Sequence, residues 1–60
     1  MKVFLVRRLA DGTMHTFTAK SIHGRGGVFD QLLAKGPTRG EIFEVKERLG
    51  TDGWKRYELI

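Results

Sequence analysis

The 60-residue sequence contains no cysteine and only one proline. Without cysteine the chain cannot form disulfides, zinc ribbons or thiol-based catalytic and redox sites. A domain this short buries only about 60% of the surface that its unfolded chain exposes, so we expect marginal stability. Small domains usually gain stability from disulfides, a metal or a partner subunit. Disulfides are excluded here, and the lack of cysteine fits a reducing, cytoplasmic location.

Long apolar runs are also missing. The N-terminal segment MKVFLVRRLA has an apolar run over residues 3–6, which is too short for a signal peptide and is ended by Arg7 and Arg8. No stretch approaches the roughly 20 apolar residues of a membrane-spanning helix. The sequence has no repeats, low-complexity tracts or linkers. We therefore expect a single soluble, unprocessed domain over residues 1–60, with no membrane contact.

The net charge of +4 is unevenly distributed. Residues 1–40 hold seven basic and two acidic residues, a net charge of +5, whereas residues 41–60 hold four basic and five acidic residues, a net charge of −1. A basic surface typically accompanies a phosphate-rich partner. It also improves solubility without any partner. The charge pattern fits both explanations.

The first third of the chain has the pattern of a β-hairpin. Two apolar-rich runs, 2–9 and 14–22, flank Asp11-Gly12, which is a strong signal for a type I′ turn with positive φ at both positions. This turn would pair Leu9 with Met14 and Val6 with Phe17. The expected core face carries Phe4, Val6, Phe17 and Ala19. The other face carries Val3, Leu5, Leu9 and Met14 among Arg7, Thr16, Thr18 and Lys20, so the first strand is expected to be central in the sheet or part of an interface.

A second hairpin is predicted over residues 41–60. A three-residue loop, 51–53, would put Gly53 at the position that needs positive φ and would pair Lys46 with Glu58. Shifting the register by one residue would separate the apolar residues of the two strands. The preferred register gives a core face of Phe43, Val45, Leu49, Tyr57 and Leu59. The solvated face then carries Glu44, Lys46, Arg48, Trp54, Arg56 and Glu58.

Residues 28–35, between the hairpins, predict a short α-helix. Phe29 and Leu33 are four residues apart and Leu32 lies beside them, which gives one apolar stripe. Gly36 fits the C′ position, and Pro37 fits the stop beyond it. About two turns of helix are stable only when packed on a sheet. The predicted fold is α+β in the order ββαββ, a four-stranded, mainly antiparallel sheet with the helix on one face and the strand order open.

The segment SIHGRGGVF, residues 21–29, joins the first hairpin to the helix. Its glycines Gly24, Gly26 and Gly27, with Arg25 and His23, fit an anion cradle at a helix N-terminus. The spacing matches neither a P-loop nor a dinucleotide fingerprint. Two other interpretations are a flexible joint and a helix that starts at Ser21, the latter disfavoured because three interior glycines cost about 3 kcal/mol.

Two groups of side chains are candidates for binding a partner. Trp54 with Arg48 and Arg56 would form a solvated cluster able to stack on bases or to anchor a protein interface. The alternative is a Trp54 that folds over the end of the sheet and staples the turn. A basic track suited to phosphates would consist of Arg7, Arg8, Lys20 and Arg25. The alternative for these cations is protection of an edge strand against aggregation.

Catalysis has little support in the sequence. Ser21 and His23 are two residues apart, but no carboxylate is placed to orient His23. His15 and His23 are too few for a metal site with scattered acids, and no cofactor motif is present. We therefore expect no enzymatic activity, no cofactor and no bound metal.

Two hypotheses for function remain. The first is a non-catalytic, small basic module that docks on nucleic acid or a nucleoprotein through the cations and Trp54. The second is a protein-docking inhibitor or adaptor of the type found in phages and mobile elements, with the apolar face of the first hairpin as its anchor and homodimerisation as one option. Salt dependence distinguishes them, since phosphate binding weakens steeply as salt rises. A structural subunit of a larger assembly is a third, minor hypothesis.

Overall fold

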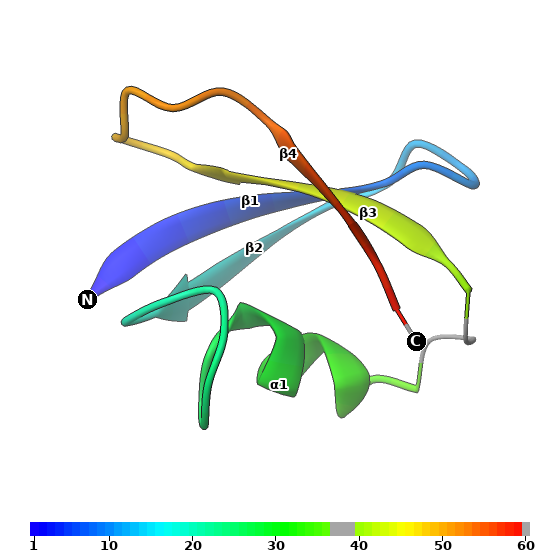
Figure 1. Ribbon diagram of the computed structural model, residues 1–60, viewed down its shortest axis with the longest axis horizontal. Coiled ribbons are helices and arrows are strands. Elements are labelled where there is room, and N and C mark those ends of the chain that lie inside the picture. The colour runs from blue at the N-terminus through cyan, green and yellow to red at the C-terminus, as the bar shows by residue number, and fades with distance from the viewer. Residues whose placement is uncertain (37–39, 60) are drawn as a thin grey trace.

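The architecture is a four-stranded antiparallel sheet with one helix (Figure 1). The computed structural model describes residues 1–36 and 40–59. The elements follow in the order β1 (Lys2–Arg8), β2 (Met14–Ala19), α1 (Val28–Leu33), β3 (Ile42–Glu47) and β4 (Lys55–Glu58). The predicted ββαββ α+β fold is confirmed. Pro37, predicted to stop the helix, and Ile60, at the end of the second hairpin, lie outside the described residues.

The strand order is β2-β1-β3-β4, so β1 and β3 are central and β2 and β4 form the edges. A central position explains why β1 has apolar residues on both faces, with Val3 and Leu5 half-buried on the side away from the helix. It also corrects one interpretation of Arg7 and Arg8. These residues cannot protect a sheet edge, because the backbone of β1 is paired on both sides.

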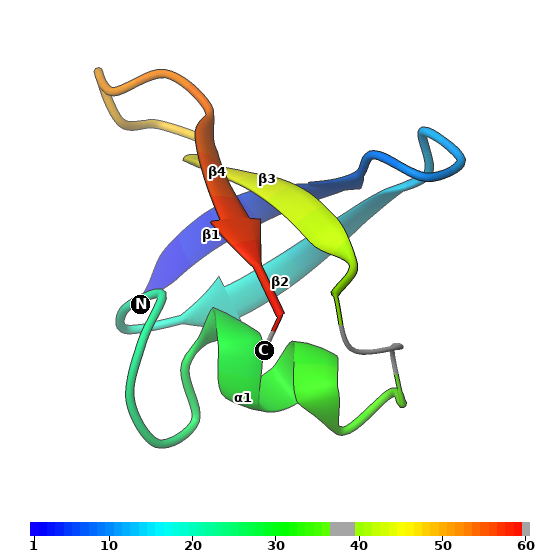
Figure 2. The same cartoon turned by 45° about the vertical axis from the view of Figure 1, so that its right-hand side comes forward.

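The core lies between the sheet and α1. Figure 2 shows α1 beneath one face of the sheet, with the opposite face left uncovered by the described chain. Ile22, Phe29 and Tyr57 pack around the margin of the core. The predicted core faces of both hairpins are confirmed except at Leu49. The buried core residues are Phe4, Val6, Phe17, Ala19, Val28, Leu32, Phe43, Val45 and Leu59.

The register of the first hairpin differs from the prediction by two residues. Phe4 lies opposite Phe17, and the loop has four residues, 9–12, closed by a 2.9 Å hydrogen bond from Arg8 N to Thr13 O. The Asp11 carboxylate accepts hydrogen bonds from the N and Oγ1 of Thr13, at 3.0 and 2.8 Å. Asp11 keeps a negative φ in this local turn, and Gly12 alone takes a positive φ of 75°. A shift of two residues preserves the faces, because side chains alternate with a period of two.

The second hairpin departs further from its prediction. Phe43 lies opposite Tyr57, a shift of four residues, and Glu58 lies opposite Ile42 instead of Lys46. Gly53 does not have the predicted positive φ. Leu49 is 85% exposed and does not belong to the core. The register of β3 depends on β1 as well as on β4. Arg48 N donates to Val3 O at 2.9 Å, so the chain after β3 continues along β1, whereas its pairing with β4 ends at Val45 and Lys55.

The helix is shorter than predicted, and its buried side is rotated. Val28 and Leu32, four residues apart, are buried, whereas Leu33 is 55% exposed and does not belong to the buried stripe. Phe29 lies at the side and contacts Tyr57, with ring centroids 4.9 Å apart. Val28–Leu32 and Phe29–Leu33 have the same i, i+4 spacing. Which pair is buried depends on how α1 is oriented on the sheet, and periodicity alone does not specify that orientation. Gly36 takes a positive φ of 79°, but it lies two residues beyond the C-cap Ala34 and not at the predicted C′ position, because the helix ends earlier than predicted.

Candidate functional site

The sheet face turned away from α1, here called the open face, holds one group of the predicted site residues. It carries the odd-numbered residues of β1 and the even-numbered residues of the other strands, because these alternate with the buried ones. The predicted site residues on it are Arg7 and Arg56, with Trp54 and Arg48 at the adjoining strand ends. Arg48 joins them because its backbone pairs with Val3. Residues from three strands therefore meet on one surface.

Arg7 and Trp54 form the centre of the open face. The Arg7 guanidinium lies over the Trp54 ring, with Cζ 4.4 Å from the ring centroid. Arg7 Nε and Nη2 both donate to Glu44 Oε1, at 3.0 and 2.5 Å. Trp54 is half-buried, so it neither enters the core nor extends freely into solvent. The indole is held against the sheet by a guanidinium that is itself held by a carboxylate.

Glu44 connects the cations of β1 and β4. It lies directly opposite both Arg7 and Arg56, and its Oε2 is 3.6 Å from Arg56 Nη2. The hydrogen bonds from Arg7 lower the pKa of Glu44 most, and the charges of Arg7 and Arg56 lower it further. The carboxylate therefore stays ionised and balances part of the positive charge of the cluster.

Two further cations on this face make no ion pair within the described residues. Lys46 and Arg48 follow Glu44 along β3 and its extension, and no carboxylate lies within ion-pairing distance of either. Lys46 lies opposite Leu5 on β1. Leu5 in turn lies on the same face as Arg7, which stacks on Trp54. The face thus offers an aromatic ring beside uncompensated positive charge.

The predicted residues Lys20 and Arg25 lie elsewhere, at the end of β2. They line a shallow groove of about 200 Å³ with Met1, Ser21, Gly26 and Gly27. Lys20 and Arg25 make no ion pair within the described part of the chain. They therefore extend the positive charge to the end of the sheet near the N-terminus.

The glycine joint folds into a turn stabilised by its own hydrogen bonds. Gly24 and Gly26 take positive φ values of 93° and 73°, and Gly27 is the N-cap of α1. The amides expected to face an anion have internal acceptors: Gly26 N donates to the Asp30 carboxylate at 2.9 Å, and Gly27 N donates to Gly24 O at 3.1 Å. The anion cradle of Gly24, Gly26 and Gly27 remains a prediction, and in this structure Asp30 supplies the negative charge at the helix start.

The helix does not begin at Ser21, so that interpretation is wrong. Val28 N donates to Ser21 O at 3.2 Å and Phe29 N donates to Ile22 O at 3.1 Å, which fastens the first helical residues to the end of β2. The Ser21 hydroxyl donates to His23 O instead of capping the helix. Positive φ at Gly24 and Gly26, and the close approach of Gly27 to the backbone of Ile22 and His23, make this turn possible.

Arg8 lies on the helix side of the sheet and does not join the open face. Its Nη2 donates to Glu41 Oε1, and its Nη1 is 3.5 Å from Asp11 Oδ2. The hydrogen bond to Glu41 raises the pKa of Arg8 most. The four residues of the predicted basic track therefore lie in three places. Arg7 is on the open face, Arg8 is on the helix side of the sheet, and Lys20 and Arg25 are at the glycine joint after β2.

Sequence reasoning missed two arrangements. Glu44 was expected on the solvated face, but its role between Arg7 and Arg56 depends on the β1–β3 pairing, which links residues 37 apart. The second is an aromatic cluster in which the rings of His23, Phe29 and Tyr57 lie 4.9 to 5.5 Å apart between centroids. The apolar spacing of the helix gave a signal for Phe29 only.

Some features are absent from residues 1–36 and 40–59. In this part of the chain no three acidic or histidine side chains gather in a way that would hold a metal ion. No described helix is long and apolar enough to cross a membrane. Comparison with protein-family models, with curated proteins and with solved structures finds no match.

Proposed function

We propose that this protein is a non-catalytic binding module that docks on nucleic acid or a nucleoprotein through the open face. The observation that carries the proposal is the Trp54–Arg7 stack beside Lys46 and Arg48 on an uncovered sheet. Flat sheets with exposed aromatic rings and nearby cations are typical of proteins that bind single strands. Single-stranded nucleic acid is therefore the favoured form of the ligand.

Each part of the face would have a separate role. A base would stack on the accessible part of the Trp54 ring, which every base can do because each has a π-face. Lys46 and Arg48 would neutralise phosphates, since neither has an ion-pair partner within the described residues. Arg56 would contribute less charge, because Glu44 already faces it at 3.6 Å.

The testing experiment is a titration of Trp54 fluorescence with single-stranded and duplex oligonucleotides of about ten nucleotides. We expect saturable quenching by the single strand that weakens as salt rises from about 0.01 M to about 0.15 M, because bound phosphates release counterions. Light scattering on the same sample reports the mass of the protein. Absence of quenching in a monodisperse sample at low salt would contradict the proposal.

Matched variants locate the binding surface. With a labelled oligonucleotide, Trp54→Ala should weaken binding by roughly five- to a hundredfold, the cost of one lost base–aromatic stack of about 1–3 kcal/mol. Lys46→Glu should weaken it as well and reduce the salt dependence. Lys35→Glu makes the same change in net charge on the helix side and should bind like the wild type. Equal losses in both charge variants would show attraction by net charge instead of a defined site.

A second candidate is a protein-docking inhibitor or adaptor. It is favoured by exposed apolar side chains at the hairpin end of the open face, namely Leu9, Met14 and Ile42. Leu9 N donates to Ile42 O, which makes these two residues neighbours, and Met14 lies opposite Arg7 at the same end of the sheet. Such a surface would bind a protein, or a second copy of this chain, with weak dependence on salt.

The two candidates make opposite predictions for one pair of variants. If the protein acts by protein docking, Met14→Asp should abolish capture of the partner or self-association, while Lys46→Glu should have little effect. If it binds nucleic acid, Lys46→Glu should be the damaging change. Both side chains are at least partly exposed, so neither substitution should prevent folding.

A further inference from the structure

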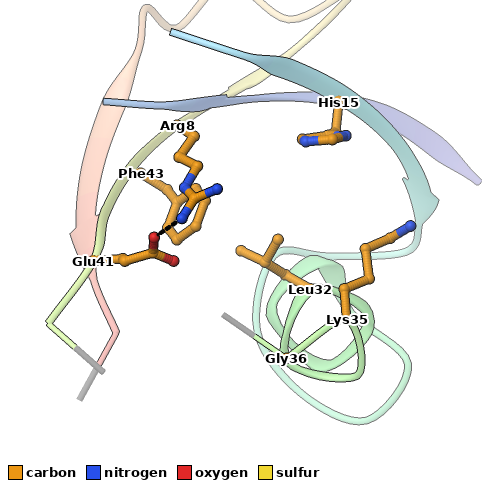
Figure 3. A pocket seen from close by; sticks show the side chains of 7 residues that line it. All are labelled: Arg8, His15, Leu32, Lys35, Gly36, Glu41 and Phe43. Carbon is orange, nitrogen blue, oxygen red and sulfur yellow. Dashed lines mark hydrogen bonds and ion pairs between the residues drawn. The ribbon is translucent and has the colours of Figure 1, made fainter. Parts of the chain in front are cut away.

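A pocket lies on the other side of the sheet from the open face. The pocket opens between the C-terminal end of α1 and the hairpin end of β1, β2 and β3 (Figure 3). Its volume is about 220 Å³, enough for a small organic molecule, not a polymer. It is separate from the proposed nucleic-acid surface, because its sheet residues point toward the helix.

The pocket has positively charged and hydrogen-bonding groups on two sides. Arg8 projects from β1 on one side, and His15 of β2 and Lys35 beyond α1 lie on the other (Figure 3). Lys35 Nζ is 5.8 Å from the centroid of the Phe17 ring, which keeps the ammonium beside β2. Glu41 is the acidic residue among the lining residues, and it is engaged by Arg8 Nη2. The lining therefore favours a negatively charged group.

The base of the pocket is apolar. Leu32 and Phe43 line it, and both belong to the buried core. Their positions are fixed by core packing, so the surface is present before any ligand binds. In addition, Arg8 Nε is buried and has no acceptor among the described residues. A buried donor without an acceptor is rare in folded proteins and is often satisfied by a bound group or water.

We propose that this pocket binds a small organic anion. The carboxylate or phosphate of the ligand would pair with Lys35 and His15, facing Arg8, and its apolar body would rest on Leu32 and Phe43. Such a ligand has a charged head for the polar side of the pocket and an apolar body for its base. Contacts with only one of these two surfaces would bind a ligand weakly. This site shares no residue with the open face, so failure of the nucleic-acid proposal would not affect it.

The test is NMR titration of the ¹⁵N-labelled 60-residue protein with three probes: phenyl phosphate, inorganic phosphate and phenol. Phenyl phosphate should give saturable shifts at the amides of residues around the pocket. Inorganic phosphate lacks the apolar body and phenol lacks the charge, so each should bind at least about fivefold more weakly. Equal binding of phosphate and phenyl phosphate, or shifts that never saturate, would overturn the proposal.

Two charge variants provide the control. Lys35→Glu should weaken phenyl phosphate binding by at least about fivefold, because it replaces an attractive charge with a repulsive one. Lys55→Glu makes the same change at a residue that does not line the pocket and should bind phenyl phosphate like the wild type. Both residues are at the surface, and unchanged amide spectra in the absence of ligand confirm the fold. Equal affinity in Lys35→Glu and the wild type would overturn the assignment of the site.

Discussion

Gly27 shows how one residue without a side chain determines a local path of the chain. Its φ of −74° is open to any residue. A β-carbon at this position, however, would lie 2.8 Å from His23 O and 2.9 Å from Ile22 O, both backbone atoms. The glycine is therefore required for close approach between the start of the helix and the end of β2, and its backbone conformation is not the reason.

Gly27→Ala should reduce stability by about 1–3 kcal/mol, because the backbone must shift to admit the methyl group. A 60-residue domain has only about 3–9 kcal/mol in total, so the loss is a large fraction. Gly53→Ala is the control, since Gly53 has open space around its Cα and no positive φ. Urea denaturation of the three proteins provides the comparison. Equal midpoints for Gly27→Ala and the wild type would show that the turn is not rigid.

Glu44 predicts how stability depends on pH. Its folded pKa is lowered by Arg7, so its contribution to stability is fully present above the pKa of the unfolded carboxyl, about 4.3, and is lost as the pH falls through the folded pKa. Glu44→Gln should therefore be less stable than the wild type at pH 7. The difference should shrink as the pH is lowered toward about 3.

Urea midpoints at several pH values measure this difference. Glu58→Gln removes a carboxylate from the same face that makes no ion pair within the described residues, and it should stay close to the wild type at pH 7. A Glu44→Gln difference that is constant down to pH 3 would mean that the loss comes from packing and not from the charge.

At the scale of elements, α1 depends on the sheet. Six residues are too few for a helix to be stable alone, so its stability comes from the packing of its buried side. Its start is fixed by the hydrogen bonds to Ser21 O and Ile22 O, and Gln31 Nε2 donates to Thr18 O on β2 at 2.9 Å. That bond also occupies a carbonyl at the β2 edge of the sheet.

Two neighbouring leucines test which side of α1 is buried. Leu32→Ala should cost about 2–5 kcal/mol, since it leaves a cavity under the sheet, and should bring the protein near unfolding. Leu33→Ala should cost no more than about 0.5 kcal/mol, because Leu33 is largely exposed. Thermal unfolding monitored by circular dichroism measures both. The reverse order would restore the Phe29–Leu33 stripe predicted from periodicity.

At the scale of the whole molecule, both hairpins and the helix share one core. Val6 of β1, Phe17 of β2, Leu32 of α1 and Val45 of β3 belong to the same buried cluster. No hairpin has a core of its own, so partial unfolding would expose apolar surface that nothing else covers. We therefore expect the elements that carry the open face and the pocket to unfold together.

Unfolding should therefore be a single two-state transition. Trp54 fluorescence reports the β4 side of the open face, and far-ultraviolet circular dichroism reports the strands and helix. Both signals should give the same urea midpoint and slope, as expected for a small domain with one core. Distinct midpoints would show that β4 separates from the sheet before the rest unfolds.

The fold class, the element order and most of the core follow from the residue pattern. Strand alternation predicted that Phe4, Val6, Phe43 and Val45 point to the core side. The registers differ from the prediction by two and four residues, and these even shifts leave each side chain on its predicted face because the side-chain period is two. Gly36 likewise indicated the end of the helix to within two residues through its own backbone freedom.

The tertiary structure alone decided the strand order, the registers and the composition of the sites. Pairing of β1 with β3 brings Arg7 to Glu44 and holds Arg48, just past the end of β3, against Val3, and these contacts join residues far apart in the chain. The separation of Arg7 from Arg8, in contrast, follows from strand alternation alone, because adjacent residues of a strand point to opposite faces. Local patterns carry information on faces and turns, whereas which distant residues meet depends on how the strands are ordered.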